Sequence, residues 1–188
     1  TTFLIFNDCL LATRNIKPNS LFFALKGENF NGNEFAEEAL NKGAEVAIVD
    51  EEAYAKDQDN YIFVEDCLDA LQQLATFHRH FLGIPVLAIT GSNGKTTTKE
   101  FMAQVFTGQR PTLATQGNLN NHIGLPLTVL RATPEEVFLI LEMGTSGPGE
   151  LATLCRFAQP HIGVITTIAE EHTETLKDLD GVLAAETE

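Results

Sequence analysis

Residues 86–100 read VLAITGSNGKTTTKE, an apolar stretch that runs through a glycine loop into a polar stretch. The short apolar run at residues 86–90 is typical of a buried strand, and we expect a helix over roughly residues 95–106. A buried strand that leads through such a loop into a helix is a unit of the parallel α/β folds, in which helices cover both faces of the sheet. This stretch therefore predicts the fold class of the second half of the chain.

The loop at residues 91–96 has the features of a phosphate-binding loop. Its glycines let the backbone turn tightly and direct successive N–H groups at phosphate oxygens, and the N-terminal end of the following helix adds positive charge. Lys95 can reach the β- and γ-phosphates of ATP, and the Thr96 hydroxyl can bind Mg²⁺. The pattern GxxxxGK[ST] is incomplete because Ile89 occupies its first position. The alternative is an ordinary glycine turn with a solvated lysine, which the strand and helix on either side disfavour. The expected nucleotide contacts are Gly91, Ser92, Asn93, Gly94, Lys95, Thr96 and Thr97.

Upstream of this stretch, the chain alternates strand-like and helix-like segments. Strands are expected at residues 21–25, 44–50 and 61–65, and helices at residues 34–42 and 66–81. The sequence Gly83-Ile84-Pro85 ends the second helix and marks the expected domain boundary. We therefore expect a small α/β domain at residues 1–83 and a second domain at residues 84–188.

Downstream, strands are expected at residues 137–143 and 162–168, with a helix near residues 149–158 between them. The alternation of continuous apolar strands with helices predicts a mostly parallel sheet of the kind that ATP-binding α/β domains contain. Residues 181–188 have the composition of a helix that is still in progress, without a cap or a closing element. We therefore expect the chain to be part of a longer protein whose second domain is incomplete here.

The composition excludes some classes of protein. The net charge of −14 over 188 residues argues against a surface for nucleic acid or an anionic membrane, which needs a basic patch. The three cysteines are far apart in the sequence, so we expect reduced thiols and neither a disulfide framework nor a zinc site. Neither a membrane-spanning run nor a signal peptide is evident, and we expect a cytoplasmic protein.

Polar side chains follow three of the strands in the second domain. Ligands of open parallel sheets gather at the carboxyl ends of the strands, so Gly91, Glu142 and His172 are expected to face one crevice. Glu142 and His172 are candidate Mg²⁺ ligands there, directly or through water. The alternatives are that Glu142 caps a helix near Gly147 and that His172 is a surface residue.

Two further loops are rich in glycine and asparagine. Residues 116–126 and 26–35 could bind polar groups of a ligand, or they could only form turns. Arg14, ahead of the second of these loops in the sequence, could face a diphosphate.

These segments together resemble the Mur ligases of peptidoglycan synthesis. The resemblance is carried by ITGSNGKTTTKE (89–100), QGNLNNHIGLPLT (116–128), EMGTSGPGEL (142–151) and TRNIKPNSLFFALKGENFNGNEF (13–35). It covers nearly the whole chain. It implies a UDP-binding domain, a central ATPase domain and a third domain that this sequence does not contain.

The resemblance also implies an activity and roles for individual residues. In such a ligase, ATP phosphorylates the terminal carboxylate of UDP-N-acetylmuramoyl-tripeptide, and the amine of D-alanyl-D-alanine attacks the acyl phosphate. Lys95, the loop amides and Mg²⁺ neutralise the transferring phosphoryl group. The implied Mg²⁺ ligands are Thr96 and Glu142 for one ion and His172 for a second. The implied substrate contacts are Thr13, Arg14, Lys26, Asn29, Asn120 and Asn121. We expect a monomer.

The sequence departs from the family at two places. Ala12 stands where the family often has aspartate, before Thr13-Arg14, which affects the uridine contacts. Glu186 stands where many members have a lysine that becomes a carbamate and helps to hold Mg²⁺. We hypothesise that the Glu186 carboxylate substitutes for that carbamate; the alternative is an exposed helix residue without such a role.

Two other functions stay open at this point. One is a related ligase, either another Mur ligase or a folylpolyglutamate synthetase-like enzyme, although the GNLNN loop argues against it. The other is a non-catalytic module that binds the UDP substrate or phosphate.

Overall fold

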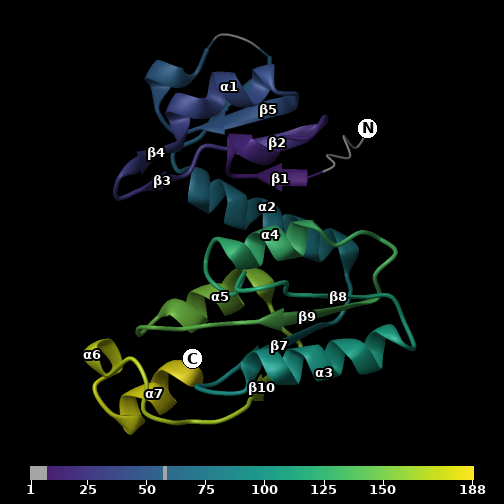
Figure 1. The fold of residues 1–188 in the computed structure, drawn as a ribbon, viewed down its shortest axis with the longest axis vertical. Coiled ribbons are helices and arrows are strands. Elements are labelled where there is room, and N and C mark those ends of the chain that lie inside the picture. The colour runs from purple at the N-terminus through teal and green to yellow at the C-terminus, as the bar shows by residue number, and fades with distance from the viewer. Residues whose placement is uncertain (1–7, 57–58) are drawn as a thin grey trace. The chain divides into compact units, whose positions relative to one another are not determined.

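The structure, a computed structural model, describes residues 8–56 and 59–188 of the chain, which divides into two compact units at residues 71 and 72 (Figure 1). Helix α2 (Cys67–Leu82) contributes residues to both units. Each unit has a parallel sheet and helices, so the expected α/β class is confirmed. The domain boundary expected at residues 83 and 84 follows the end of α2 and stays a prediction.

The first unit is built on a four-stranded sheet in the order β1-β2-β5-β6, with every neighbouring pair parallel. Its strands are β1 (Asp8–Leu10), β2 (Ser20–Phe23), β5 (Ala44–Val49) and β6 (Tyr61–Phe63). All four residues of β2 are buried, as expected for an inner parallel strand. A short antiparallel pair, β3 (Lys26–Gly27) and β4 (Phe30–Asn31), follows β2. The three strands expected in this part are therefore confirmed.

Short helices complete the first unit. The expected helix at residues 34–42 is present as a 3₁₀ turn, η2 (Gly32–Phe35), that continues into α1 (Ala36–Asn41). Helix α1 packs against β5. Two more 3₁₀ turns, η1 (Thr13–Asn15) and η3 (Glu52–Tyr54), lie between strands.

The second unit has a four-stranded parallel sheet in the order β10-β7-β9-β8. Its strands are β7 (Val86–Thr90), β8 (Thr112–Ala114), β9 (Phe138–Glu142) and β10 (Ile162–Ile165). Its helices are α3 (Lys95–Thr107), α4 (Gly124–Leu130), α5 (Glu150–Ala158), α6 (Thr173–Leu176) and α7 (Leu179–Glu186).

The alternation of side chains along β7 divides the core of this unit in two. Val86 and Ala88 pack on one face with apolar residues of α4 and α5. Leu87 and Ile89 pack on the opposite face with Met102 and other residues of α3. Successive side chains of a strand point to opposite faces, so a run that is apolar at every position is covered on both. The expectation of a sheet buried on two sides is confirmed.

Most predicted segments differ from the observed elements by one to three residues at an end, and two of these differences have a visible cause. Strand β10 ends at Ile165, three residues before the expected end, because Thr166 and Thr167 leave the sheet and bond to the glycine loop. The last helix begins at Leu179, and the Asp178 carboxylate caps it by accepting a hydrogen bond of 2.9 Å from the Gly181 N–H. The helix therefore starts two residues before the expected segment, at a capped N-terminus.

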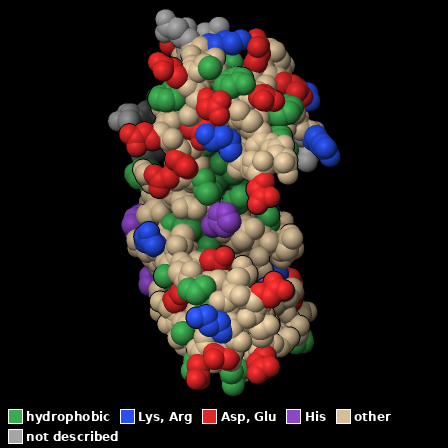
Figure 2. All heavy atoms as spheres, turned by 90° about the vertical axis from the view of Figure 1, so that its left-hand side faces the viewer, with side chains coloured by type: hydrophobic (Ala, Val, Ile, Leu, Met, Phe, Trp, Pro, Cys, Tyr) green, Lys and Arg blue, Asp and Glu red, His purple; other side chains and the backbone are tan. Residues whose placement is uncertain are grey.

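The described surface is acidic and the described helices are short. Figure 2 shows Lys and Arg side chains scattered among acidic ones, without a continuous basic patch on that face. Within residues 8–56 and 59–188, every helix is too short or too polar to cross a bilayer.

Candidate functional site

The glycine loop turns out of β7 in a conformation that requires glycine. Gly91 has φ +117° and Gly94 has φ +84°, and both values lie in the region that favours glycine. A Cβ atom at Gly91 would lie 2.5 Å from Thr166 Oγ1 and 2.9 Å from Thr166 N. The loop therefore packs directly against the segment that follows β10, and no larger residue fits at position 91.

The first three main-chain N–H groups of the loop are already bound within the protein. Gly91 N–H donates to Glu186 Oε2 at 2.8 Å. Ser92 N–H donates to the Thr167 carbonyl at 2.9 Å, and Asn93 N–H donates to Thr167 Oγ1 at 3.0 Å. These contacts hold the loop in place, but they leave these amides less available to a phosphate than the sequence suggests.

The next four amides are the candidate anion site. In the part of the chain that the structure describes, residues 94–97 donate no main-chain hydrogen bond, as expected for the first turn of a helix. Lys95 Nζ lies beside them and donates to the Gly91 carbonyl at 2.5 Å and the Ser92 carbonyl at 3.3 Å. Thr96 is exposed to solvent. Open amides, a lysine and a hydroxyl at a helix N-terminus form a site for a phosphate group.

Glu142 ends β9 as a buried carboxylate that is only partly bound. Its Oε1 accepts a hydrogen bond of 3.0 Å from Asn120 Nδ2, and its N–H donates to Thr115 Oγ1 at 3.0 Å. Its Oε2 is buried and has no hydrogen-bond partner. Glu150, and not Glu142, accepts from the Ser146 N–H, which excludes the alternative that Glu142 caps the helix near residue 147.

A lysine that the sequence analysis missed lies against this carboxylate. Lys99 is 1% exposed, and its Nζ lies 3.6 Å from Glu142 Oε2 and 3.0 Å from Glu100 Oε1. The sequence offered one indication: Lys99 is four residues after Lys95, so both side chains are expected on the same face of the predicted helix. Spacing alone does not distinguish a buried lysine from a solvated one.

Glu186 lies at the start of the glycine loop. It is 2% exposed, and its Oε2 accepts from the Thr90 hydroxyl and from Gly91 N–H. Its Oε1 is buried without a hydrogen-bond partner. The alternative that Glu186 is an exposed helix residue was therefore wrong.

His172 is the N-cap residue just before α6; it has φ +47° and is exposed. Its carbonyl accepts hydrogen bonds from the Thr175 and Leu176 N–H groups, so its main chain stabilises the first turn of α6. Across the described residues, no group of three or more His, Cys, Asp or Glu side chains is arranged to hold a metal ion. The structure thus brings Glu186 and Glu142 to the ends of β7 and β9 without assembling them and His172 into one ligand set.

The loop at residues 116–126 has two asparagines with different tasks. Asn120 binds Glu142, as described above, and its carbonyl accepts from the Gly144 N–H at 2.9 Å. Asn121 Oδ1 accepts from the N–H groups of Ile123 and Gly124 at 3.1 and 2.8 Å, and so stabilises the start of α4. A cavity of about 350 Å³ adjoins this loop and the start of α5; its lining includes Asn121, His122, Gly144 and Glu150.

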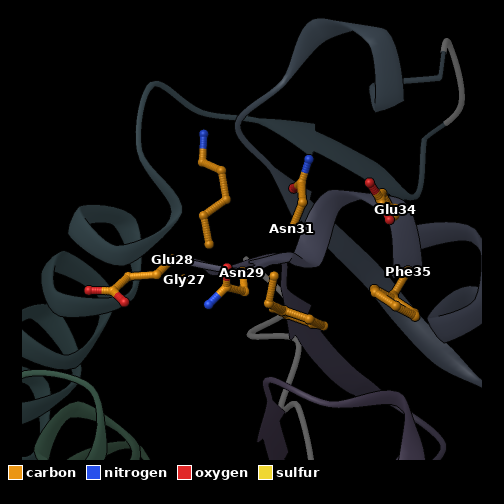
Figure 3. A pocket seen from close by; sticks show the side chains of 8 residues that line it. Gly27, Glu28, Asn29, Asn31, Glu34 and Phe35 are labelled. Atoms are coloured by element: carbon orange, nitrogen blue, oxygen red, sulfur yellow. The ribbon is translucent and has the colours of Figure 1, made fainter.

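The first unit has a separate cavity of about 480 Å³ along the segment from β3 to η2. Its lining includes Lys26 and Asn29, and Phe30 and Phe35 stack with ring centroids 5.2 Å apart. Figure 3 shows Glu28 extending to the opposite side from Phe35. This cavity brings together two of the expected substrate contacts.

The other two expected contacts in this unit lie elsewhere. Thr13 and Arg14 belong to η1 and do not line the cavity. The Thr13 hydroxyl donates to Glu38 Oε1 at 2.9 Å, and Arg14 is exposed.

Comparison with known proteins gives consistent matches in both units. The family "Mur ligase middle domain" matches residues 89–188, and "Mur ligase family, catalytic domain" matches residues 10–79. A UDP-N-acetylmuramoyl-tripeptide–D-alanyl-D-alanine ligase of Bacillus subtilis (strain 168) is 43% identical over 178 residues, which cover 94% of this chain and 39% of that protein.

Solved structures agree with this. MurF from Acinetobacter baumannii superimposes with a TM-score of 0.88 at 34% identity, over 96% of this chain and 40% of that one. A MurF ligase from Thermotoga maritima in complex with ADP gives a TM-score of 0.89 at 32% identity, over 100% of this chain and 43% of that one. The chain thus spans about two fifths of the length of these relatives.

Proposed function

Because the chain belongs to the Mur ligase family, we propose that it carries the ATP site and part of the substrate site of an ATP-dependent amide ligase. The substrates of this reaction are UDP-N-acetylmuramoyl-tripeptide and D-alanyl-D-alanine, and the product is part of the peptidoglycan precursor pathway. Support comes from the names of the relatives, which describe this ligase, and from the ADP in the Thermotoga maritima structure. In this proposal, residues 1–83 bind the UDP substrate and residues 84–188 bind ATP.

The observation that carries this proposal is the set of open amides at the start of α3. Residues 94–97 offer N–H groups at the positive end of the helix, and Lys95 adds a cation beside them. On binding ATP, Lys95 exchanges its contacts with the Gly91 and Ser92 carbonyls for phosphate oxygens. The amides of Gly91, Ser92 and Asn93 keep the loop in shape while this happens.

The chemistry needs negative charge to be neutralised around the γ-phosphoryl group. The terminal carboxylate of the tripeptide attacks the γ-phosphorus, and ADP leaves. The amine of D-alanyl-D-alanine then attacks the acyl carbon, and phosphate leaves after the amine has lost a proton. Lys95 and the fixed amides stabilise the charge that develops in the first step, because they need no reorganisation as it forms.

Two carboxylates near the strand ends have the chemistry of magnesium ligands. The buried oxygens Glu142 Oε2 and Glu186 Oε1 have no hydrogen-bond partner, and carboxylate and hydroxyl oxygens are the ligands that Mg²⁺ prefers. We assign Thr96 and Glu142 to one ion and His172 to a second, with Glu186 as a carboxylate ligand in place of a carbamate. When bound, Mg²⁺ neutralises charge on the β- and γ-phosphates.

For the substrate, we propose that Lys26 and Asn29 in the 480 Å³ cavity, together with Thr13 and Arg14, contact the UDP part. Asn120 and Asn121 lie on the loop that adjoins Glu142, and we propose that they contact the substrate near the reacting groups. We propose a monomer in the cytoplasm, where ATP is available and the three thiols stay reduced.

The test is phosphate release by the natural full-length protein, with D-alanyl-D-alanine present or withheld. We expect release only when ATP, UDP-N-acetylmuramoyl-tripeptide and D-alanyl-D-alanine are all present. Lys95→Met should abolish it, whereas Lys56→Met, which removes an exposed lysine paired with Glu37, should not. Phosphate release with another amine acceptor in place of D-alanyl-D-alanine would support the related-ligase alternative. Binding of the UDP substrate without ATP binding would support the non-catalytic module.

A further inference from the structure

The feature that the proposed mechanism does not use is the buried ammonium group of Lys99. At 1% exposure, it is among the largest fully buried side chains of the described residues, although lysine is rarely buried without a partner. Removing an ammonium group from water is unfavourable unless an opposite charge compensates for it. Two carboxylates are near enough to do so, on Glu142 and Glu100.

Glu142 is the partner that explains the burial of Lys99. The Glu100 side chain is 68% exposed, so a lysine that served only Glu100 could remain in solvent. The Glu142 side chain is 4% exposed, and Lys99 Nζ is 3.6 Å from its Oε2. The opposite oxygen of Glu142 is held by Asn120, so the lysine and the asparagine approach the carboxylate at its two separate oxygens.

Stability alone is a poor explanation for this pair. Buried ion pairs of this kind often contribute less to folding than apolar residues of the same size would. Here, in addition, both Lys99 Nζ and Glu142 Oε2 lack a hydrogen-bond partner. A carboxylate oxygen that is oriented by charge but not bound keeps its lone pairs for a ligand.

The position of Lys99 on α3 indicates what this arrangement does. Thr96 and Lys99 are three residues apart on one helix and so lie on neighbouring positions of its surface. The ion pair therefore ties the end of β9 to α3 next to its first turn. We infer that Lys99 is a positioning residue, which holds the Glu142 carboxylate in register with the Thr96 hydroxyl so that both can bind one divalent cation. This inference rests on the proposed function of the site.

The experiment measures ADP binding by calorimetry on the natural full-length protein, over a range of Mg²⁺ concentrations. The wild type should bind ADP more tightly as Mg²⁺ is added. In the absence of Mg²⁺, Lys99→Met and the wild type should bind ADP equally tightly, because residues 94–97 are unchanged. The variant should need about tenfold more Mg²⁺ than the wild type for the same increase in ADP affinity. Lys99→Arg, which keeps the charge, should recover part of the response. Glu100→Gln is the matched control and should behave as the wild type.

Different failures have different meanings. A wild type that does not bind ADP would overturn the proposed function and this inference with it. A normal Mg²⁺ response in Lys99→Met, or an equal loss in Glu100→Gln, would overturn the inference alone. If Lys99→Met does not fold, the double variant Lys99→Met/Glu142→Gln removes both buried charges. It should match Glu142→Gln in its Mg²⁺ response, and a further loss in the double variant would show that Lys99 does not act through Glu142.

Discussion

Asp50 in the first unit and Glu142 in the second are both buried carboxylates at the ends of parallel strands, but their oxygens are bound to different degrees. Asp50 follows β5; its Oδ1 lies 2.8 Å from Asn33 Nδ2 and 3.1 Å from Lys26 Nζ. Its Oδ2 accepts from the Cys67 N–H at 3.3 Å. Glu142 has one bound oxygen and one without a hydrogen bond.

This difference distinguishes Asp50, an anchor that holds parts of the fold together, from Glu142, the proposed metal ligand. Burial disfavours the charge of Asp50, but the hydrogen bonds from Asn33, Lys26 and Cys67 outweigh it and hold the pKa of Asp50 below its ordinary value of 3.8. Its oxygens thus already join a loop, a lysine and a helix. Cys67 is anchored with it: burial raises the pKa of its thiol to about 12, and the thiol donates to the Ile48 carbonyl. The Glu142 carboxylate keeps capacity for a ligand from outside the protein.

The largest effect that would test this comparison is the loss of ligase activity in Glu142→Gln. We expect phosphate release per folded molecule to fall on the order of 10²-fold or more, because a fixed charge at the proposed phosphoryl-transfer site is lost while the size of the side chain is kept. The measurement is phosphate release by the full-length protein, scaled by the folded fraction from circular dichroism. Near-normal turnover per folded molecule would mean that Glu142 is an anchor like Asp50, and the comparison would fail.

Asp50→Ala should lower the stability of the fold and leave ligand binding unchanged. It leaves the Asn33 amide and the Cys67 N–H without their acceptor, and we expect the free energy of unfolding to fall by roughly 2 kcal/mol. Urea denaturation measures this loss. ADP affinity should stay at the wild-type value, since the proposed nucleotide site lies on the second unit. A variant with wild-type stability and weakened ADP binding would contradict the assignment of Asp50 as an anchor.

The smallest effect concerns the dependence of stability on pH. Since the pKa of Asp50 is lower in the folded state, its charge stabilises the fold fully above the unfolded value of 3.8. That contribution is lost as the pH falls through the lower, folded pKa. Thermal unfolding followed from about pH 5 to about pH 2 should therefore show a shallower decline for Asp50→Asn than for the wild type. Parallel curves for the two proteins would show that another carboxylate causes the acid instability.

Much of the fold could be predicted because its signals are local. The strands β5, β7 and β9 are mainly apolar, and the glycine loop has a distinctive spacing of residues. Strand β8 has only three residues, all half-buried, and α4 begins with Gly-Leu-Pro, so neither has the period that reveals longer elements. Elements of this size are defined by the neighbours against which they pack.

The site shows the same division between local and distant information. Lys95 and Thr96 could be placed from spacing alone, and Glu142 from its position at a strand end. The contact of Glu142 with Lys99 joins residues 43 positions apart, and that of Gly91 with Glu186 joins residues 95 positions apart. No pattern within a short window of sequence contains such pairs, so the partners of each charged group could not be derived before the fold was known.

The close approach of Gly91 to Thr166 has a consequence for how this loop can change. Because a methyl group at residue 91 would overlap atoms of residue 166, including its backbone nitrogen, trimming the threonine side chain alone would not make room. The glycine loop and the segment that follows β10 therefore constrain each other. A larger residue at position 91 would require a different backbone path after β10. A redesign of this loop should therefore leave residue 91 unchanged.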